Sequence, residues 1–323
     1  LEAQLRSALE PPRMKLLTQF NELPQGVKFL VDMRSELLRL RREHPNLVPL
    51  EVDLKRLLSA WFDVGLLQLE EINWSSSAEL LEKLIAYEAV HAIQSWTDLK
   101  NRLDSDRRCF AFFHPNMPDE PLIFVEVALV KGMANNVQAL LDESAPLEDI
   151  RLADTAIFYS ISNAQKGLSG ISFGNFLIKS VVKKLQQEFP QLKQFATLSP
   201  IPGFCRWLDS MDAVKASDLL GEDSMSSSPE QLQKLAAHYL VEQKQKRNVK
   251  HARDPVAHFH LSNGAKLERL NWMADTSDNG VKQSAGMMVN YLYELPHIES
   301  RSQSYSADGK VAVSTSVEKQ LNL

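Results

Sequence analysis

The sequence predicts an α+β protein, in which an all-helical first part is followed by a mixed-sheet domain with helices. Two observations lead to this fold class. Over residues 1–90, apolar side chains such as Leu30, Met33 and Leu37 recur at helical spacing, with charged residues between them. After residue 91, short apolar runs bounded by proline and aspartate alternate with longer amphipathic segments. We therefore expect a helical domain over residues 1–90 and a second domain over residues 91–323.

The helical segments of the first part are separated by residues that end or begin helices. Prolines at positions 11, 12, 24, 45 and 49 fall between the amphipathic runs, where a helix breaks. The run from Leu54 to Phe62 is followed by Gly65, which is typical of a helix end. The pattern predicts a helical bundle.

The second part mixes predicted strands with predicted helices. The expected strands cover residues 109–113, 122–129, 156–161, 195–198, 257–261 and 285–295. The expected helices cover residues 173–189 and 231–245. Residues 118–121 (PDEP) predict a hairpin turn between the first two strands, and the Ser/Asp-rich residues 209–229 predict an exposed, mobile connection.

Composition excludes several classes of function. The chain has 323 residues, 44% of them hydrophobic and 24% charged, and no run reaches the roughly 18 apolar residues of a membrane span. The net charge of −5 provides no basic field for nucleic acid. Cys109 and Cys205 are the two cysteines, too few for a disulfide framework, which indicates a reducing compartment. The chain begins with Leu1 rather than methionine, so a preceding targeting segment is compatible with it.

A glycine-rich turn between a predicted strand and a predicted helix is the first candidate site. Gly167, Gly170 and Gly174 lie in residues 160–174. Glycine lets backbone N–H groups converge on an anion, and the N-terminus of the next helix adds its dipole. The spacing matches neither the phosphate loop of nucleoside triphosphatases nor the dinucleotide fingerprint. A phosphate cradle and a purely structural turn are both compatible with these residues.

Ser199 is the second candidate, in residues 197–204 (TLSPIPGF) at the end of a predicted strand. Pro200 and Pro202 restrict the backbone and Gly203 permits a tight turn, so the serine is expected to be held rigidly. The segment is not a Gly-x-Ser-x-Gly nucleophile elbow. A turn serine without chemistry is the alternative reading.

Two histidines lie close together in the predicted strand at residues 257–261. In a strand, His258 and His260 point to the same face, which is also a spacing of metal ligands. No cysteine, aspartate or third histidine follows at a suitable distance, so we expect no metal site. One histidine acting as a proton donor fits better, because the pKa of histidine lies near neutral pH.

Several longer motifs follow one another along the chain. They are residues 156–162 (AIFYSIS), 198–204 (LSPIPGF), 259–265 (FHLSNGA), 271–275 (NWMAD) and 290–293 (NYLY), preceded by 59–65 (SAWFDVG) and 88–91 (EAVH). Over nearly the whole chain, these motifs and their order resemble those of the malonyl-CoA decarboxylase family.

The resemblance implies a fold, an activity and an assembly. The first part is expected to serve oligomerisation, as a dimer or tetramer. The second is expected to be a catalytic domain with the fold of the GCN5-related acetyltransferases. The implied activity converts malonyl-CoA to acetyl-CoA and CO2 by stabilising an enolate and protonating C2. No metal and no organic cofactor is expected, because the thioester itself accepts the electrons.

The resemblance also implies site residues. Ser199 matches the catalytic serine, His260 the catalytic histidine and Tyr293 an active-site tyrosine. The glycine-rich turn is similar to the Gln/Arg-x-x-Gly-x-Gly pyrophosphate loop of acetyltransferases. The residues expected to bind substrate there are Gln165, Lys166, Gly167, Leu168, Ser169, Gly170 and Ser172. Ser172 stands where some relatives carry glutamate, so the role of that carboxylate does not carry over.

Two other functions remain compatible with the residues. An acyl-CoA N-acyltransferase would use the same fold and loop, but it needs an amine site, for which the pairing of Ser199 with His260 gives no reason. A non-catalytic CoA-binding scaffold would follow if Ser199 and His260 lay far apart. The expected partners are malonyl-CoA, acetyl-CoA and further copies of the chain, without nucleic acid or membrane. The expected location is the cytoplasm of a bacterium, or the mitochondrial matrix, peroxisome or cytosol of a eukaryote.

Overall fold

The computed structural model describes residues 11–171, 176–211, 228–246 and 248–322. The chain divides into two compact units, each drawn from three segments. The first unit consists of Leu1–Ala92, Phe110–Phe124 and Ile161–Phe173. The second unit consists of Ile93–Cys109, Val125–Ser160 and Gly174–Leu323. The predicted domain boundary near residue 90 stays a prediction, because each unit takes segments from both sides of it.

The first unit is mainly helical. Up to Ala92 its elements are α2 (Pro12–Gln19), η1 (Phe20–Glu22), α3 (Gly26–Leu40), η2 (Pro45–Leu47), α4 (Val48–Trp61), η3 (Val64–Leu66), β1 (Gln68–Ile72) and α5 (Ala78–Tyr87). Prolines lie in the first turns of α2, η2 and α4, where a missing N–H costs nothing. The strand β1 departs from the all-helical prediction, because sheet pairing rather than its own side-chain pattern makes it extended.

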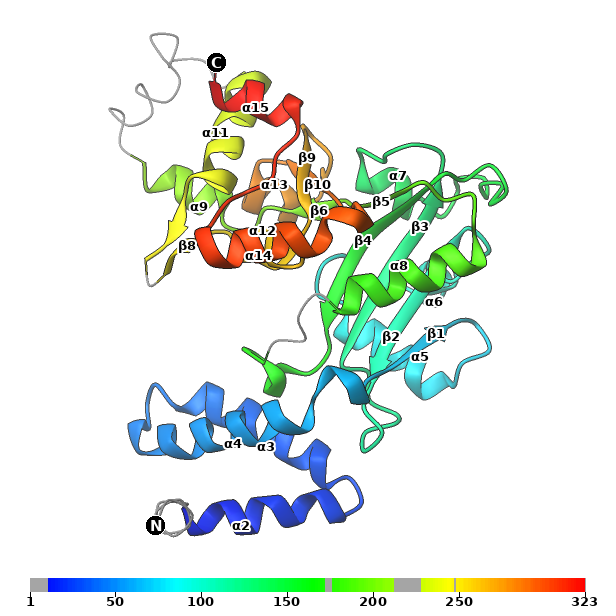
Figure 1. Cartoon of the computed structure of the whole chain (residues 1–323). Helices are drawn as coiled ribbons and strands as arrows, with labels where there is room; N and C mark the ends of the chain where they lie inside the picture. The colour runs from blue at the N-terminus through cyan, green and yellow to red at the C-terminus, as the bar shows by residue number, and fades with distance from the viewer. Residues whose placement is uncertain (1–10, 172–175, 212–227, 247, 323) are drawn as a thin grey trace. The chain divides into compact units, whose positions relative to one another are not determined.

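The core of this unit lies between α3 and α4, which run side by side in Figure 1. Leu30 and Val31 of α3 and Leu54 and Leu58 of α4 are fully buried. Leu30, Leu54 and Leu58 are among the side chains whose helical spacing predicted the elements, so the apolar stripe forms the contact.

The second unit combines a mixed sheet with helices. Its strands are β2 (Arg107–Phe113), β3 (Ile123–Val130), β4 (Thr155–Asn163), β5 (Gln194–Thr197), β6 (Ser199–Pro200), β9 (Lys266–Asn271) and β10 (Met288–Leu292), with β7 (Lys244–Gln245) and β8 (Asn248–Ala252) in a separate hairpin. Its helices are α6 (Trp96–Arg102), α7 (Val137–Leu141), α8 (Phe176–Glu188), α9 (Phe204–Asp209), α11 (Pro229–Val241), α12 (Pro255–Ser262), α13 (Asp278–Ser284), η5 (Leu295–His297), α14 (Ile298–Asp308) and α15 (Thr315–Asn322). Strands β2, β3 and β4 also contribute residues to the first unit.

The main sheet has the order β1-β2-β3-β4-β5-β10-β6, and β9 pairs with β10. β4 and β5 are parallel and are connected through α8, whereas β10 is antiparallel to β5, β6 and β9. In Figure 1, α8 runs along the sheet. Its Leu177, Val181 and Leu185 are buried. This confirms the predicted fold class, a helical first part followed by a mixed-sheet domain.

Most predicted elements of the second part are confirmed, and one is wrong. Residues 257–261 are helical, within α12, instead of forming a strand. The predicted mobile connection at 209–229 lies mainly outside the described residues. Within the described part of the chain, no helix is long and apolar enough to cross a membrane.

Candidate active site

Ser199 lies at a break in the sheet. β5 ends at Thr197 and β6 begins at Ser199, and both strands pair with β10. Between them, Leu198 donates its N–H to the carbonyl of Phe158 in β4. The two prolines that follow restrict the backbone, so Ser199 is fixed by the sheet before it and by the turn after it. The structure thus places Ser199 between a paired strand and a proline-containing turn, and its rigidity stays a prediction.

His260 lies next to Ser199 and belongs to α12. The helix begins at an Asp-Pro pair: Asp254 is the N-cap, accepting from the N–H groups of Val256 and Ala257, and Pro255 is the first helical residue. It ends before Gly264, which has a φ of +81°. The strand prediction was wrong because it followed the apolar and polar alternation and overlooked these helix start and stop signals.

Ser199, His260 and Tyr293 form one chain of hydrogen bonds. Oγ of Ser199 lies 3.0 Å from Nε2 of His260, and Nδ1 of His260 lies 2.8 Å from the hydroxyl of Tyr293. The three side chains are only 6%, 3% and 2% exposed. The structure thus joins the three residues that the resemblance singled out, although 94 positions separate Ser199 from Tyr293 in the chain (293 − 199).

The partners of Ser199 assign a direction to this chain. Its hydroxyl donates to Oγ1 of Thr197 at 2.8 Å. With that hydrogen directed at Thr197, the compatible tautomer of His260 donates from Nε2 to Ser199 and accepts at Nδ1 from Tyr293. In this arrangement every O–H and N–H points the same way, from Tyr293 through His260 and Ser199 to Thr197.

Burial controls the protonation of this chain. It lowers the pKa of His260 to about 3, so the imidazole is neutral near pH 7. It also raises the pKa of Tyr293 well above its usual range, so the phenol keeps its proton. All three groups are therefore neutral before the reaction.

Three residues that sequence reasoning missed support the chain. Tyr291 stacks on the imidazole of His260, with ring centroids 4.5 Å apart. The side-chain amide of Asn290 donates to the carbonyl of Thr197 at 2.7 Å. Thr197 itself accepts from Ser199. All three lie inside the motifs that carried the resemblance or next to them, and that was the signal that could have found them.

His258 takes no part in this chain. On a helix, residues two positions apart face different sides, so the two histidines of the predicted pair separate. Nδ1 of His258 lies 2.9 Å from the hydroxyl of Tyr305, and its ring stacks on His251. Among the described residues, no group of three His, Cys, Asp or Glu side chains is placed to hold a metal ion.

Asp254 connects the two halves of the site. Its Oδ1 accepts from the two N–H groups at the start of α12, and its Oδ2 accepts from the N–H of Gly203 at 3.3 Å. The carboxyl is fully buried. The helix that carries His260 and the turn that follows Ser199 are therefore held by one side chain.

The glycine-rich turn lies in the first unit, where it forms the short helix η4 (Lys166–Leu168) and the residues after it. The predicted residues separate into two groups. Lys166, Ser169 and Gly170 are exposed. Gln165, Gly167 and Leu168 are buried. Ser172 lies outside the described residues.

The buried members of this turn have structural partners. The amide of Gln165 donates to the carbonyl of Pro121 at 3.0 Å and to Glu120 at 3.2 Å. Gly167 packs against α3 so closely that a Cβ there would lie 1.8 Å from the carbonyl oxygen of Val31. Gly170 has a φ of +75°, a conformation that favours glycine. Only the exposed members are thus placed to meet a ligand.

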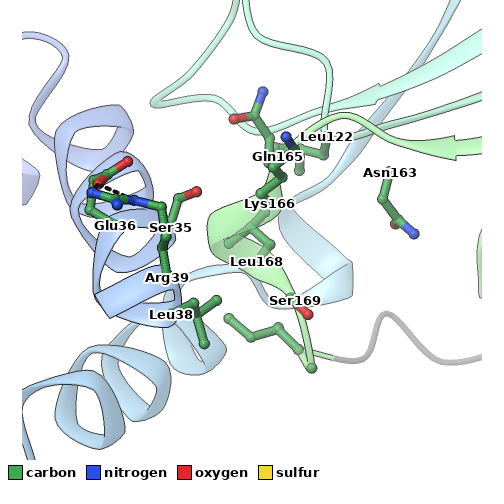
Figure 2. A pocket seen from close by; sticks show the side chains of 12 residues that line it. Ser35, Glu36, Leu38, Arg39, Leu122, Asn163, Gln165, Lys166, Leu168 and Ser169 are labelled. Atoms are coloured by element: carbon green, nitrogen blue, oxygen red, sulfur yellow. Dashed lines mark hydrogen bonds and ion pairs between the residues drawn. The ribbon is translucent and has the colours of Figure 1, made fainter. Parts of the chain in front are cut away.

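A cavity of about 730 Å³ borders the turn within the first unit. Most of its lining residues come from α3 and from the turn, among them Ser35, Arg39, Lys166 and Ser169, and Leu122 and Asn163 complete it, as Figure 2 shows.

Comparison with known proteins adds to this geometry. Residues 65–323 match the model of the malonyl-CoA decarboxylase C-terminal domain, and residues 1–62 match that of the N-terminal domain. The chain belongs to the malonyl-CoA decarboxylase family.

Individual members of the malonyl-CoA decarboxylase family are similar over most of their length. The chain is 38% identical to the mitochondrial malonyl-CoA decarboxylase of Mus musculus, over 98% of this chain and 72% of that protein. It is 37% identical to the mitochondrial enzyme of Anser anser anser, over 98% and 70%.

Two crystal structures of bacterial malonyl-CoA decarboxylases have the same fold. The enzyme of Rhodopseudomonas palustris superposes with a TM-score of 0.91 at 43% identity, covering 98% of this chain and 82% of that one. The enzyme of Cupriavidus metallidurans gives a TM-score of 0.84 at 47% identity, covering 96% and 82%.

Proposed function

We propose that this chain converts malonyl-CoA to acetyl-CoA and CO2, and that Ser199, His260 and Tyr293 relay the proton that C2 receives. The observation that carries the proposal is the hydrogen-bonded chain, with distances of 3.0 and 2.8 Å between neutral, buried groups. Membership of a carboxy-lyase family supports the reaction class.

The first step breaks the bond between C2 and the carboxylate. Its electron pair moves into the thioester carbonyl, which becomes an enolate, and CO2 leaves. The nearly dry surroundings of Ser199 assist this step, because a carboxylate that loses its water is destabilised relative to neutral CO2. We assign to the Ser199 hydroxyl the task of orienting the carboxylate before it leaves.

The second step protonates C2. Nε2 of His260 is already bonded to Ser199, so the shortest proton path to C2 runs over Oγ of Ser199. For this transfer the hydroxyl of Ser199 turns from Thr197 toward the substrate, gives its proton to C2 and takes the Nε2 proton, while Nδ1 takes the proton of Tyr293. An enolate carbon is a strong base, so neutral donors suffice. The raised pKa of Tyr293 then favours its reprotonation from solvent, which supplies the net proton.

We expect Tyr293→Phe to lower kcat by about 10- to 100-fold while KM for malonyl-CoA changes little, because the ring is kept and only the proton source is lost. Steady-state kinetics and the melting temperature measure both effects. A variant with normal kcat would show that the relay ends at His260.

The reaction itself is tested by incubating the protein with malonyl-CoA and no acceptor. A decarboxylase produces acetyl-CoA and CO2, and in D2O the methyl group carries one deuterium. An acyl-CoA N-acyltransferase, the main alternative, leaves malonyl-CoA unchanged until an amine is added.

The exposed part of the glycine-rich turn is proposed to bind the pyrophosphate of coenzyme A. Lys166 supplies a positive charge, and Gly170 supplies a backbone N–H that has no acceptor among the described residues. Three other N–H groups of the turn, those of Leu168, Ser169 and Ile171, are used within it. We therefore assign pyrophosphate binding to Lys166, Ser169 and Gly170, and not to all seven residues that the sequence predicted.

The pH dependence of the reaction provides a test of Asp254. Burial raises the pKa of this carboxyl to about 6, against the opposing effect of the three N–H groups that it accepts. We expect wild-type kcat to fall as the pH drops through about 6, because protonation weakens the bond to Gly203. Asp254→Asn should have a lower kcat, by about tenfold, that no longer changes between pH 5 and pH 7.

The free energy of unfolding should respond to pH in the opposite direction to kcat, and rise as the pH falls. The pKa of Asp254 is higher in the folded protein than the ordinary value of 3.8, so the ionised carboxyl costs stability above pH 6 and this cost disappears as the pH falls toward 4. If kcat of the Asp254→Asn variant still fell as the pH dropped through about 6, the group whose protonation lowers kcat would be a residue other than Asp254.

We also propose that the chain self-associates as a dimer or tetramer. Large apolar side chains of the helical part are more than half exposed, namely Leu16, Leu23, Phe29 and Val52. Light scattering at micromolar concentration tests this, and a monomer would contradict it.

A further inference from the structure

Arg34 is a buried arginine that joins two helices to the glycine-rich turn. It lies in α3 and is 1% exposed. Its Nε and Nη2 donate to Oε1 of Glu51 in α4, at 3.0 and 2.9 Å. Its Nη1 donates to the carbonyl of Gly167 at 2.5 Å, and Nη2 donates to the carbonyl of Ser169 at 2.9 Å. One guanidinium therefore satisfies a buried carboxylate and two carbonyls of the turn.

These carbonyl contacts determine where the N–H groups of the turn point. In a trans peptide unit the C=O and the next N–H point in opposite directions, and no peptide of the described residues is cis. The carbonyl of Ser169 points at Arg34, so the N–H of Gly170 must point away from it. Gly170 is exposed, so its N–H faces the accessible side of the turn.

The accessible side carries positive charge. Lys166 lies on it, and Nζ of Lys55 in α4 lies 3.3 Å from the place that a Cβ would take at Gly170. Neither lysine has an ion-pair partner among the described residues. The turn is thus held from behind by Arg34 and presents an N–H and two ammonium groups on its other face.

We propose that Arg34 is a positioning residue for coenzyme A: by holding the carbonyls of Gly167 and Ser169, it turns the Gly170 N–H toward the pyrophosphate. This inference rests on the proposed function of the turn. It gives the helical part a task in ligand binding, in addition to the oligomerisation expected of it. Glu51 serves by keeping the guanidinium in place.

The test compares malonyl-CoA with malonyl-pantetheine, which has the same reacting group but no pyrophosphate. The variants are Arg34→Lys and the double substitution Arg34→Met with Glu51→Met. The double variant leaves no unpaired charge in the core, and replacing a buried ion pair by apolar residues of similar size is often neutral for folding. Arg13→Met is the matched control, because Arg13 also pairs with a carboxylate of α4, that of Asp53, and has no hydrogen bond to the turn among the described residues.

We expect KM for malonyl-CoA to rise by about tenfold or more in both variants while kcat stays within about twofold. The kinetics with malonyl-pantetheine should not change, and Arg13→Met should resemble the wild type. Calorimetric binding of coenzyme A, compared with pantetheine, should show the same loss independently of turnover.

Three results would overturn the proposal. Unchanged KM in a folded double variant would show that Arg34 does not control binding. If the variants lost activity equally with malonyl-CoA and with malonyl-pantetheine, Arg34 would act on the fold in general and not on pyrophosphate binding. A wild-type protein that treats both substrates equally would refute the pyrophosphate assignment and leave decarboxylation intact. If the wild-type protein acted on neither malonyl-CoA nor malonyl-pantetheine, the proposed function would be refuted. Calorimetric binding of coenzyme A would then still test the role of Arg34.

Discussion

Ser199→Ala and His260→Asn are each expected to lower kcat for malonyl-CoA by about 10²- to 10⁴-fold, with little change in the affinity for coenzyme A. Both residues act on the malonyl group after it is bound, and the buried chain that joins them loses its continuity when either is removed. The double variant should be little worse than the worse single variant, because the two residues act as a unit. Rapid-quench measurement of acetyl-CoA formation and calorimetry with coenzyme A separate chemistry from binding.

His258→Asn is the matched control for His260→Asn. Both residues lie on α12, but His258 faces Tyr305 and is no part of the relay. We expect its kcat to stay within about threefold of the wild type, as for a substitution away from the site. If His258→Asn abolished turnover and His260→Asn did not, the assignment of the relay would be wrong.

Gly170→Asp is expected to weaken the binding of malonyl-CoA and acetyl-CoA by about 100-fold, because like charges placed side by side cost several kcal/mol. The new carboxylate would lie next to Lys55, so it would neutralise that ammonium group as well as repel the pyrophosphate. The positive φ of 75° is tolerated by aspartate, so the fold should remain. Calorimetry with both ligands measures the effect.

Gly170→Asn isolates the charge in this experiment. Asparagine has the same shape as aspartate and also tolerates a positive φ. The affinity of Gly170→Asn for malonyl-CoA and acetyl-CoA should therefore lie much closer to that of the wild type. Equal losses in the two variants would mean that bulk, not charge, matters at this position, and unchanged binding in both would remove the turn from the ligand site.

Local patterns were enough to predict most of the elements but not their exceptions. The apolar spacing in α3 and α4 reflects a real contact surface, because Leu30, Val31, Leu54 and Leu58 form it. The helix α12 was missed because the five alternating residues 257–261 outweighed the Asp-Pro pair in front of them. The strand β1 has no apolar alternation, and only its pairing at the edge of the sheet makes it extended.

The candidate site was predictable as a set of residues and not as an arrangement. Motif resemblance identified Ser199, His260 and Tyr293, and their hydrogen bonding follows from a fold that brings β6, α12 and the end of β10 together. Thr197 and Tyr291 were missed because they carry no distinctive chemistry in isolation. Arg34 could not be found from sequence at all, because an arginine in an amphipathic helix is usually solvated, and only the tertiary structure buries it.

The contact between Arg34 and the turn has a consequence for thermodynamic linkage. It joins residues 133 positions apart, so the turn obtains its final shape only when α3 is docked. If coenzyme A binds this docked form alone, it stabilises α3 by an amount that grows with the logarithm of its concentration. The backbone amides of Gly26–Leu40 should then exchange more slowly with deuterium as coenzyme A is added. Hydrogen exchange in a helix that contributes no residue to the proposed relay would thereby report occupancy of the substrate site.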